Sequence, residues 1–192
     1  MTQPTPEPID RRSQRTRHAL REALIQLIGE RGWDAVAVQD LCERANVGRS
    51  TFYSHFPNKD ALLLGGLEDL RAEIGRQARS QASSSRLSTS GFRFSLGLIE
   101  HAHQQRRVFR GLIGRRSGYV VQQRFREMVV RLVTDELPVS TGKLPRAAVA
   151  RALAAAFVEL LAWWVEQRSP MPPAEPALRF DELSRPFVER GS

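Results

Sequence analysis

The sequence has little cysteine, few aromatic residues and no long uncharged apolar segment. Cys42 is the single thiol among 192 residues, which excludes an intramolecular disulfide and a zinc site made of cysteines. No run of 18 apolar residues is free of charge, and we see no signal peptide. The sequence therefore predicts a cytoplasmic protein without a membrane partner. With 7% aromatic residues and little alternation of β-branched residues, it also predicts an all-α protein.

Residue patterns that support catalysis are also missing. The sequence contains no Ser/His/Asp or Cys/His arrangement, no phosphate-binding loop and no paired metal ligands. His101 and His103 stand two residues apart and point in different directions on a helix, which argues against a metal site. We expect no enzymatic activity, no metal and no cofactor. Activity that survives removal of residues 1–70 would support the enzyme hypothesis instead.

The net charge of +8 is unevenly distributed along the chain. Residues 1–60 carry +1, residues 61–134 carry +8 and residues 135–192 carry −1. The basic excess therefore lies outside the first 60 residues. A nucleic-acid partner for that segment must be inferred from its residue pattern and not from bulk charge.

The segment from Val38 to Lys59 has the pattern of two short helices joined by a tight turn. One helix face is marked by apolar residues at the spacing i, i+3, i+4, i+7, namely Val38, Leu41, Cys42 and Ala45. Asn46 and Gly48 both tolerate positive φ, so the backbone can turn sharply between the helices. Two helices with a short turn that contains glycine predict a helix-turn-helix, whose second helix enters the DNA major groove.

The second helix of this pattern, Arg49 to Phe56, divides into an apolar and a polar side. Phe52 and Phe56 lie four residues apart on one side, and the other side is formed by Arg49, Ser50, Tyr53 and Ser54, with Thr51 and His55 at its borders. A guanidinium fork and hydroxyl groups can meet base edges or phosphates. The alternative is a solvated helix face that contacts no partner. Asn58 is expected to cap the next helix, and Lys59 to point its charge at the DNA backbone.

The run AVQDLCERANVGRSTFYSHFPNKDALL resembles the DNA-binding domain of the TetR family of transcriptional regulators. The marks are Leu41, Ala45, Val47, Thr51-Phe52-Tyr53, His55-Phe56, Asn58-Lys59 and Leu62-Leu63. The resemblance covers about residues 14–70. It implies that DNA is contacted by Gln39, Arg49, Ser50, Thr51, Tyr53, Ser54, His55 and Lys59. Ala37 stands where the family usually has a capping hydroxyl residue, and Asn46 replaces the usual turn glycine, which left-handed geometry tolerates.

The remaining helices are predicted from apolar periodicity and from residues that end helices. We expect a disordered tail (1–10), a helix-turn-helix domain (11–57), a connecting helix (58–79) and a C-terminal regulatory and dimerisation domain (80–192). Ser80–Ser90 is expected to be a loop. Helices are expected at Ser13–Arg31, Gly91–Gln105, Tyr119–Leu137, Ala147–Val165 and Ala174–Arg190, with Arg106 and Arg107 closing the second of these. Val108–Ile113 is a short segment bounded by glycines.

Two basic clusters leave alternatives open. Arg11, Arg12, Arg15 and Arg17 can form an arm that contacts DNA, or simply a solvated helix start. Arg106, Arg107, Arg110, Arg115 and Arg116 can attract an anionic effector or lie near the DNA, or can form an ordinary solvated surface.

The segment Ala147–Val165 is apolar on nearly all sides, so we expect a second subunit to cover the face that its own chain leaves open. The resemblance likewise implies a homodimer through the last two helices, about 146–168 and 174–190.

Together these features predict a homodimeric regulator, by resemblance a repressor, that binds a palindromic double-stranded DNA operator and responds to a small-molecule effector. Candidate pocket residues, each of which can also be ordinary core, are Leu96, Ile99, His103, Phe109, Tyr119, Phe125, Met128 and Trp164. The alternative is a TetR-like coactivator or partner-binding regulator without an effector, which the lack of a cavity between the C-terminal helices would favour.

Overall fold

The computed structural model describes residues 11–84, 91–114, 118–139, 144–168 and 171–188, and these residues form nine α-helices and no strand. The helices are α1 (Arg11–Arg31), α2 (Val38–Arg44), α3 (Arg49–His55), α4 (Lys59–Ser84), α5 (Arg93–Gln104), α6 (Arg106–Ile113), α7 (Tyr119–Glu136), α8 (Arg146–Glu166) and α9 (Ala174–Val188). The predicted all-α class is confirmed.

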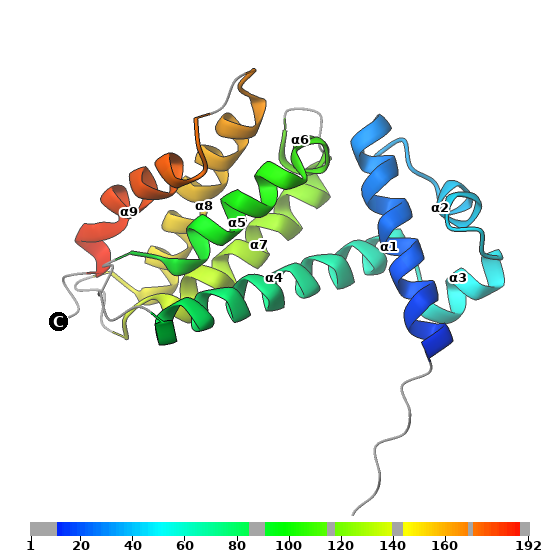
Figure 1. Cartoon of the computed structure of the whole chain (residues 1–192), viewed down its shortest axis with the longest axis horizontal. Coiled ribbons are helices and arrows are strands. Elements are labelled where there is room, and N and C mark those ends of the chain that lie inside the picture. The colour runs from blue at the N-terminus through cyan, green and yellow to red at the C-terminus, as the bar shows by residue number, and fades with distance from the viewer. Residues whose placement is uncertain (1–10, 85–90, 115–117, 140–143, 169–170, 189–192) are drawn as a thin grey trace, which may run out of the picture.

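The first three helices form a small unit, the head, at one end of the molecule, and α5 to α9 form a larger bundle, the body (Figure 1). Helix α4 starts in the head and runs along the body, so it belongs to both. Helix α1 also packs directly on α6 of the body. The head is therefore held to the body by two elements, the continuous helix α4 and the α1–α6 contact.

The helix ends around the head follow the local signals in the sequence. Gly32 follows the last residue of α1 and has a φ of 81°, which favours glycine at that place. Asn58 precedes α4, and its side-chain oxygen accepts a 2.8 Å hydrogen bond from the amide of Ala61. The predicted cap of α4 is confirmed. Gly65 and Gly66 lie within α4 without interrupting it.

Two predictions about the connections were wrong. Helix α4 continues to Ser84, so residues 80–84 are helical and not part of a loop; they contain neither proline nor glycine to end the helix. Residues 85–90 of the predicted loop lie outside the described part of the chain. Arg106 and Arg107 do not close α5, because α5 ends at Gln104 and Arg106 begins α6.

The side chains of Arg106 and Arg110 instead bind the end of α8. The two residues are four apart on α6, and each donates from Nε to the carbonyl oxygen of Val165, at 2.9 and 2.7 Å. The carbonyls at a helix C-terminus are unpaired and carry partial negative charge, so guanidinium groups stabilise that end. Two members of the second arginine cluster therefore have a structural role, which neither alternative from the sequence included. Arg115 and Arg116 lie outside the described residues.

The core of the body contains a cluster of four phenylalanines, Phe92, Phe94, Phe157 and Phe180. Their ring centroids are 4.9 to 6.2 Å apart, and all four side chains are buried. This cluster joins the start of α5 to α8 and α9. Glu136, at the end of α7, accepts hydrogen bonds from the amides of Arg93 and Phe94 (2.6 and 3.0 Å) and so caps the start of α5.

Helix α8 buries one side in the body and exposes the other. Leu153, Phe157 and Trp164 are buried, whereas Ala148 and Ala152 are exposed and Trp163 keeps 48% of its surface accessible.

By length and composition alone, α8 is the one helix in the described residues that would be long and apolar enough to cross a membrane. Half of its apolar window is buried in the protein, and a core helix of a soluble protein meets the same criteria.

Candidate DNA-binding interface

Helices α2 and α3 are joined by a turn of four residues whose backbone geometry matches the sequence pattern. Asn46 has a φ of 51°, the left-handed conformation that asparagine tolerates. The amide of Val47 donates a 2.9 Å hydrogen bond to the carbonyl of Cys42, which closes the end of α2. Gly48 then starts α3, since its carbonyl accepts from the amide of Phe52 at 3.0 Å. The predicted helix-turn-helix is present.

Aromatic side chains fix the orientation of α3 on the head. Phe52 is fully buried and Phe56 is 6% exposed, and their ring centroids lie 6.1 Å apart. Leu41 and Cys42 of α2 are buried in the same core. Because Phe52 and Phe56 occupy one side of α3, the opposite side must face solvent.

The solvent-facing side of α3, here called its outward face, consists of Arg49, Ser50, Tyr53 and Ser54. All four are exposed, and Tyr53 keeps 56% of its surface accessible while its ring packs edge-on against Phe52. Thr51 and His55 are half-buried at the borders. The Ser54 hydroxyl donates to the Thr51 carbonyl at 2.7 Å, so its oxygen lone pairs stay available to accept. The outward face thus offers a guanidinium, hydroxyls and an aromatic tip on one short helix.

Arg49 is held in place by the neighbouring helix. Its guanidinium donates a 3.0 Å hydrogen bond to the side-chain oxygen of Gln39 on α2, and the Gln39 amide donates to Glu43 at 2.9 Å. The structure therefore brings together Gln39 and Arg49, two of the residues to which the resemblance assigns DNA contact. A side chain oriented in advance loses less conformational entropy when it binds.

Lys59, the first residue of α4, is half-buried. Its ammonium donates to the carbonyl oxygens of Trp33 (3.1 Å) and Val36 (2.9 Å) and lies 4.4 Å from the centroid of the Trp33 ring. Two of its three protons thus hold the connection between α1 and α2. The sequence did not indicate this role, because the bonded carbonyls are 23 and 26 residues away.

An acidic residue protects the start of α2, where Ala37 provides no capping side chain. Asp40 accepts a 2.7 Å hydrogen bond from the Ala37 amide and pairs with Arg31 of α1 at 2.8 Å. The Ala37 hydrogen bond, followed by Arg31, lowers the pKa of the Asp40 carboxyl. An acidic residue at the third helical position is a known sequence signal for such a cap, so Asp40 was identifiable beforehand.

A second contact between α1 and α2 was not foreseen from the sequence. Arg44 donates to both carboxylate oxygens of Glu30, each at 2.8 Å, and to the side-chain oxygen of Gln26 at 3.2 Å. The hydrogen bond from Arg44 lowers the pKa of Glu30. This two-bond pairing adds a directional contact to the apolar packing of the two helices.

The basic residues at the chain start belong to α1, whose described part begins at Arg11. Arg11, Arg15 and Arg17 are exposed in its first two turns, and Arg17 lies 5.9 Å from the centroid of the Phe56 ring. The solvated helix start and the DNA-contacting arm are both compatible with this geometry. Residues 1–10, expected to be a disordered tail, lie outside the described residues.

The eight residues proposed from the sequence to line an effector pocket lie in different environments in the described structure. Ile99, Phe109, Phe125, Met128 and Trp164 are buried in the core, Leu96 is half-buried, and His103 and Tyr119 are exposed. The Trp164 indole donates to the carbonyl of Met171 at 3.0 Å, which is a structural use of its polar atom. Phe109 alone among the eight lines the cavity between head and body described below.

A compact three-helix head that exposes a polar face of α3 defines the class of helix-turn-helix DNA-binding proteins. Residues 20–65 match the family model described as bacterial regulatory proteins, tetR family, so this part of the chain is similar to the DNA-binding domain of that family. This family consists of transcriptional regulators and not of enzymes.

Relatives support this family and the fold. An uncharacterised HTH-type transcriptional regulator, YxbF of Bacillus subtilis (strain 168), is 37% identical over 67 residues, which are 34% of this chain and 18% of the relative. The chain thus matches about a fifth of that curated relative's length. A TetR transcriptional regulator from Streptococcus agalactiae 2603V is 28% identical, with a TM-score of 0.65 over 91% of this chain and 96% of that one. NalD of Pseudomonas aeruginosa, described as the secondary repressor of the MexAB-OprM multidrug efflux pump, shares the fold at 20% identity, with a TM-score of 0.65 over 94% of this chain and 100% of that one.

Proposed function

We propose that this chain is a cytoplasmic, homodimeric repressor that binds a palindromic DNA operator through the outward face of α3. The observation that carries this proposal is the division of α3 into a buried aromatic side and a polar side open to solvent. Arg49, braced by Gln39, is the candidate for base readout, because a guanidinium can donate two hydrogen bonds to guanine. The other contacts proposed are those implied by the family resemblance: Ser50, Thr51, Tyr53, Ser54, His55 and Lys59.

The proposed dimer uses α8 and α9. The exposed side of α8 carries Ala148, Ala152 and Trp163, and α9 exposes Leu178 and Leu183, at 54% and 55%. Small residues permit close approach of a partner helix, and exposed large apolar residues are favourable to cover. A dimer of this kind would place two α3 helices about 34–36 Å apart, one DNA turn, which matches a palindromic site.

The proposed repression is relieved by a small molecule that prefers a conformation with weaker DNA binding. NalD, which shares the fold, is described as a repressor. The alternative is a coactivator-like regulator that binds a protein partner and needs no effector. A cavity that touches both the head and the body favours the ligand-responsive hypothesis.

The test is a selection of bound genomic DNA fragments with the purified full-length protein. We expect the enriched fragments to share an inverted repeat, and affinity for it at physiological salt to exceed that for random DNA by at least about 1,000-fold. Equal affinity for enriched and random fragments would contradict a sequence-specific regulator. Enrichment of a site without two-fold symmetry would contradict the homodimeric mode of binding.

A further inference from the structure

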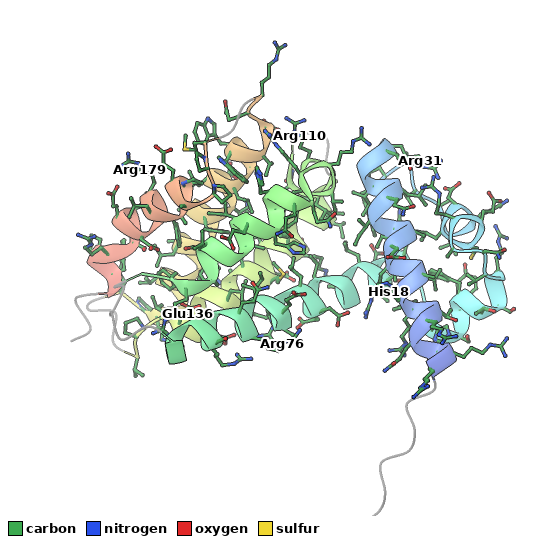
Figure 2. The ribbon with its side chains drawn as sticks, in the orientation of Figure 1. His18, Arg31, Arg76, Arg110, Glu136 and Arg179 are labelled. Atoms are coloured by element: carbon green, nitrogen blue, oxygen red, sulfur yellow. The ribbon has the colours of Figure 1, made fainter. Side chains whose placement is uncertain are left out.

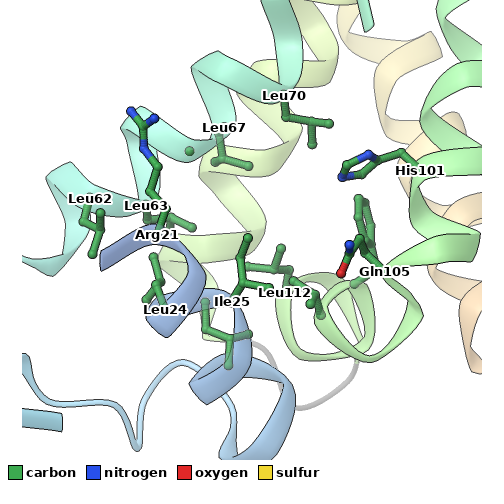
Figure 3. Close-up of a pocket in the computed structure, with 14 residues that line it drawn as sticks. Arg21, Leu24, Ile25, Leu62, Leu63, Leu67, Leu70, His101, Gln105 and Leu112 are labelled. Carbon is green, nitrogen blue, oxygen red and sulfur yellow. The ribbon is translucent and has the colours of Figure 1, made fainter. Parts of the chain in front are cut away.

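A cavity of about 100 Å³ lies where α1 of the head, the connecting helix α4 and helices α5 and α6 of the body meet (Figure 3). Its walls are mainly apolar. Leu24 and Ile28 of α1, Leu63 and Leu67 of α4, and Phe109 and Leu112 of α6 all border it. We call it the junction cavity. It is distinct from the pocket expected from the sequence within the C-terminal domain.

Three polar side chains also border the junction cavity: Arg21, His101 and Gln105. One guanidinium nitrogen of Arg21 pairs with Asp69, but its Nε is buried and has no hydrogen-bond partner among the described residues. Buried donors are nearly always paired in folded proteins, so this nitrogen can gain a partner from a bound acceptor once the Arg21 side chain shifts to expose it to the cavity. Burial lowers the pKa of His101, whose ring packs against Phe109 at 5.9 Å, so the imidazole is neutral at pH 7.

The size and chemistry of the junction cavity limit what it can bind. An apolar cavity of about 150 Å³ holds a benzene molecule, and a slightly smaller one that opens to solvent suits one small ring or a short branched chain. The charge of Arg21 is balanced by Asp69, and His101 is neutral, so no net charge calls for an ionic ligand. A neutral molecule with one oxygen acceptor satisfies both the apolar walls and the unpaired Nε.

We propose that the junction cavity binds a compact, uncharged and largely apolar molecule whose single oxygen accepts a hydrogen bond from Arg21 Nε, and that this molecule is the effector. The effector role, though not the binding site, rests on the proposed function. A molecule in this place touches α1 and α6 together. These helices are so close that a Cβ atom on Gly111 would lie 2.7 Å from the carbonyl oxygen of Ile28. Affinity for the molecule must therefore depend on how the head sits on the body, which couples ligand binding to DNA binding.

The binding site is tested on the full-length protein without DNA, with phenol and toluene as probes of nearly equal shape. Isothermal titration calorimetry should detect both, and methyl NMR signals of Leu24, Ile28 and Leu112 should shift in the wild-type protein. Arg21→Met keeps an apolar stem but removes the donor. It should weaken phenol binding about tenfold and change toluene binding less than twofold.

A blocking variant and a matched control complete this test. Gly66 borders the cavity, and a Cβ there meets no atom within 4 Å, so Gly66→Leu has room to extend a side chain into the space. It should reduce the affinity for both probes at least tenfold, and leucine favours the helix more than glycine does. Ala72→Leu, at an exposed position on the same helix, should bind both probes as the wild type does. Absence of shifts at the three methyl-bearing residues, or unchanged phenol affinity in Arg21→Met, would overturn the proposed site.

The effector role is tested with the operator obtained from the fragment selection. Saturating phenol should change operator affinity at least fivefold, and operator should change phenol affinity by the same factor, because the coupling is reciprocal. Phenol that binds without any change in operator affinity would overturn the effector role alone. A protein that binds phenol in the cavity but selects no DNA would refute the proposed function and leave the binding site standing.

Discussion

Arg49 on α3 and Gln39 on α2 are joined by a 3.0 Å hydrogen bond across the helix-turn-helix. This contact orients the guanidinium before any DNA is present. It also means that Gln39 can influence DNA recognition without reaching a base itself. The two residues belong to one small network with Glu43, so their effects on DNA binding are expected to be non-additive.

Arg49→Ala should relax sequence preference and not simply weaken binding. We expect the variant to lose about 1–3 kcal/mol of discrimination between the preferred base and the others at one or two operator positions, because a base-reading guanidinium contributes to that discrimination. Its affinity for random DNA should change little. Tyr53→Ala should weaken binding to all sequences alike, since its ring tip is suited to phosphate contact. Competition binding with single-base operator variants measures both. An equal loss on operator and random DNA for Arg49→Ala would contradict base readout.

Lys59→Met should lower stability as well as DNA affinity. The substitution keeps an apolar stem near Trp33 but removes two hydrogen bonds to the Trp33 and Val36 carbonyls. Hydrogen bonds from a charged donor are worth about 1.5–3 kcal/mol each in mutational series, so a loss of about 2 kcal/mol is expected at this half-exposed site. Urea unfolding followed by circular dichroism measures it. Arg76→Met, at an exposed position on the same helix, is the control and should stay within about 0.5 kcal/mol of the wild type. Figure 2 shows Arg76 on the part of α4 that lies along the body.

Gly111→Ala and Gly66→Ala should have opposite effects on stability. A methyl group on Gly111 would lie 2.7 Å from both the Cγ2 and the carbonyl oxygen of Ile28, so α1 and α6 must separate, at a cost of about 1–3 kcal/mol. A methyl group on Gly66 meets nothing within 4 Å and removes an unfavourable helix glycine, worth up to about 1 kcal/mol of added stability. Denaturant midpoints of the two variants give the comparison. A stabilised Gly111→Ala protein would show that α1 does not lie as close to α6 as described.

Glu136→Gln should change the pH dependence of stability above pH 4.5. Burial, the main cause, raises the pKa of Glu136 above its ordinary 4.5, although the amides of Arg93 and Phe94 act in the opposite direction. The folded state then holds the proton more tightly than the unfolded state. The contribution of this carboxyl to stability is therefore greatest below pH 4.5 and is lost as the pH rises through the raised pKa. Figure 2 shows Glu136 where α7 meets the start of α5.

The measurement for Glu136 is the difference in free energy of unfolding between wild type and variant across pH 4 to 8. This difference should move in favour of Glu136→Gln as the pH rises. Glu30 and Asp40 have lowered pKa values, so their contributions are present above their ordinary values and lost as the pH falls. Both are unchanged in the variant and cancel in the difference. Glu100→Gln, at an exposed position on α5, is the matched control. A difference that moves against Glu136→Gln with rising pH would show that the amide hydrogen bonds outweigh burial.

Ala152→Arg should weaken self-association. The residue is exposed on the side of α8 that its own chain leaves open, so a long charged side chain there would obstruct the proposed partner helix. Sedimentation velocity should show a shift from dimer to monomer at micromolar concentration, with loss of operator affinity. Ala72→Arg, exposed on α4, adds the same side chain elsewhere and should remain dimeric. A monomeric wild-type protein would contradict the dimer itself.

Local signals in the sequence determined much of this protein. Apolar spacing marked the buried side of α2 and α3, and residues such as Gly32, Asn46 and Asn58 marked where helices begin or end, because these effects depend on neighbours a few residues away. The two-sided character of α3 follows from the positions of Phe52 and Phe56 alone. The loop assigned to residues 80–84 failed because polar residues without glycine or proline are compatible with an exposed helix as well as with a loop.

Tertiary packing decided the rest. Lys59 reaches carbonyls in the head connection, Arg106 and Arg110 bind the end of α8, and Arg21 keeps an unpaired nitrogen beside a cavity bordered by four helices. Periodicity shows that a helix has an apolar side, but it carries no information on which other helix covers that side. Contacts between residues 23 to 59 positions apart, and the space left between them, exist only once the helices have packed.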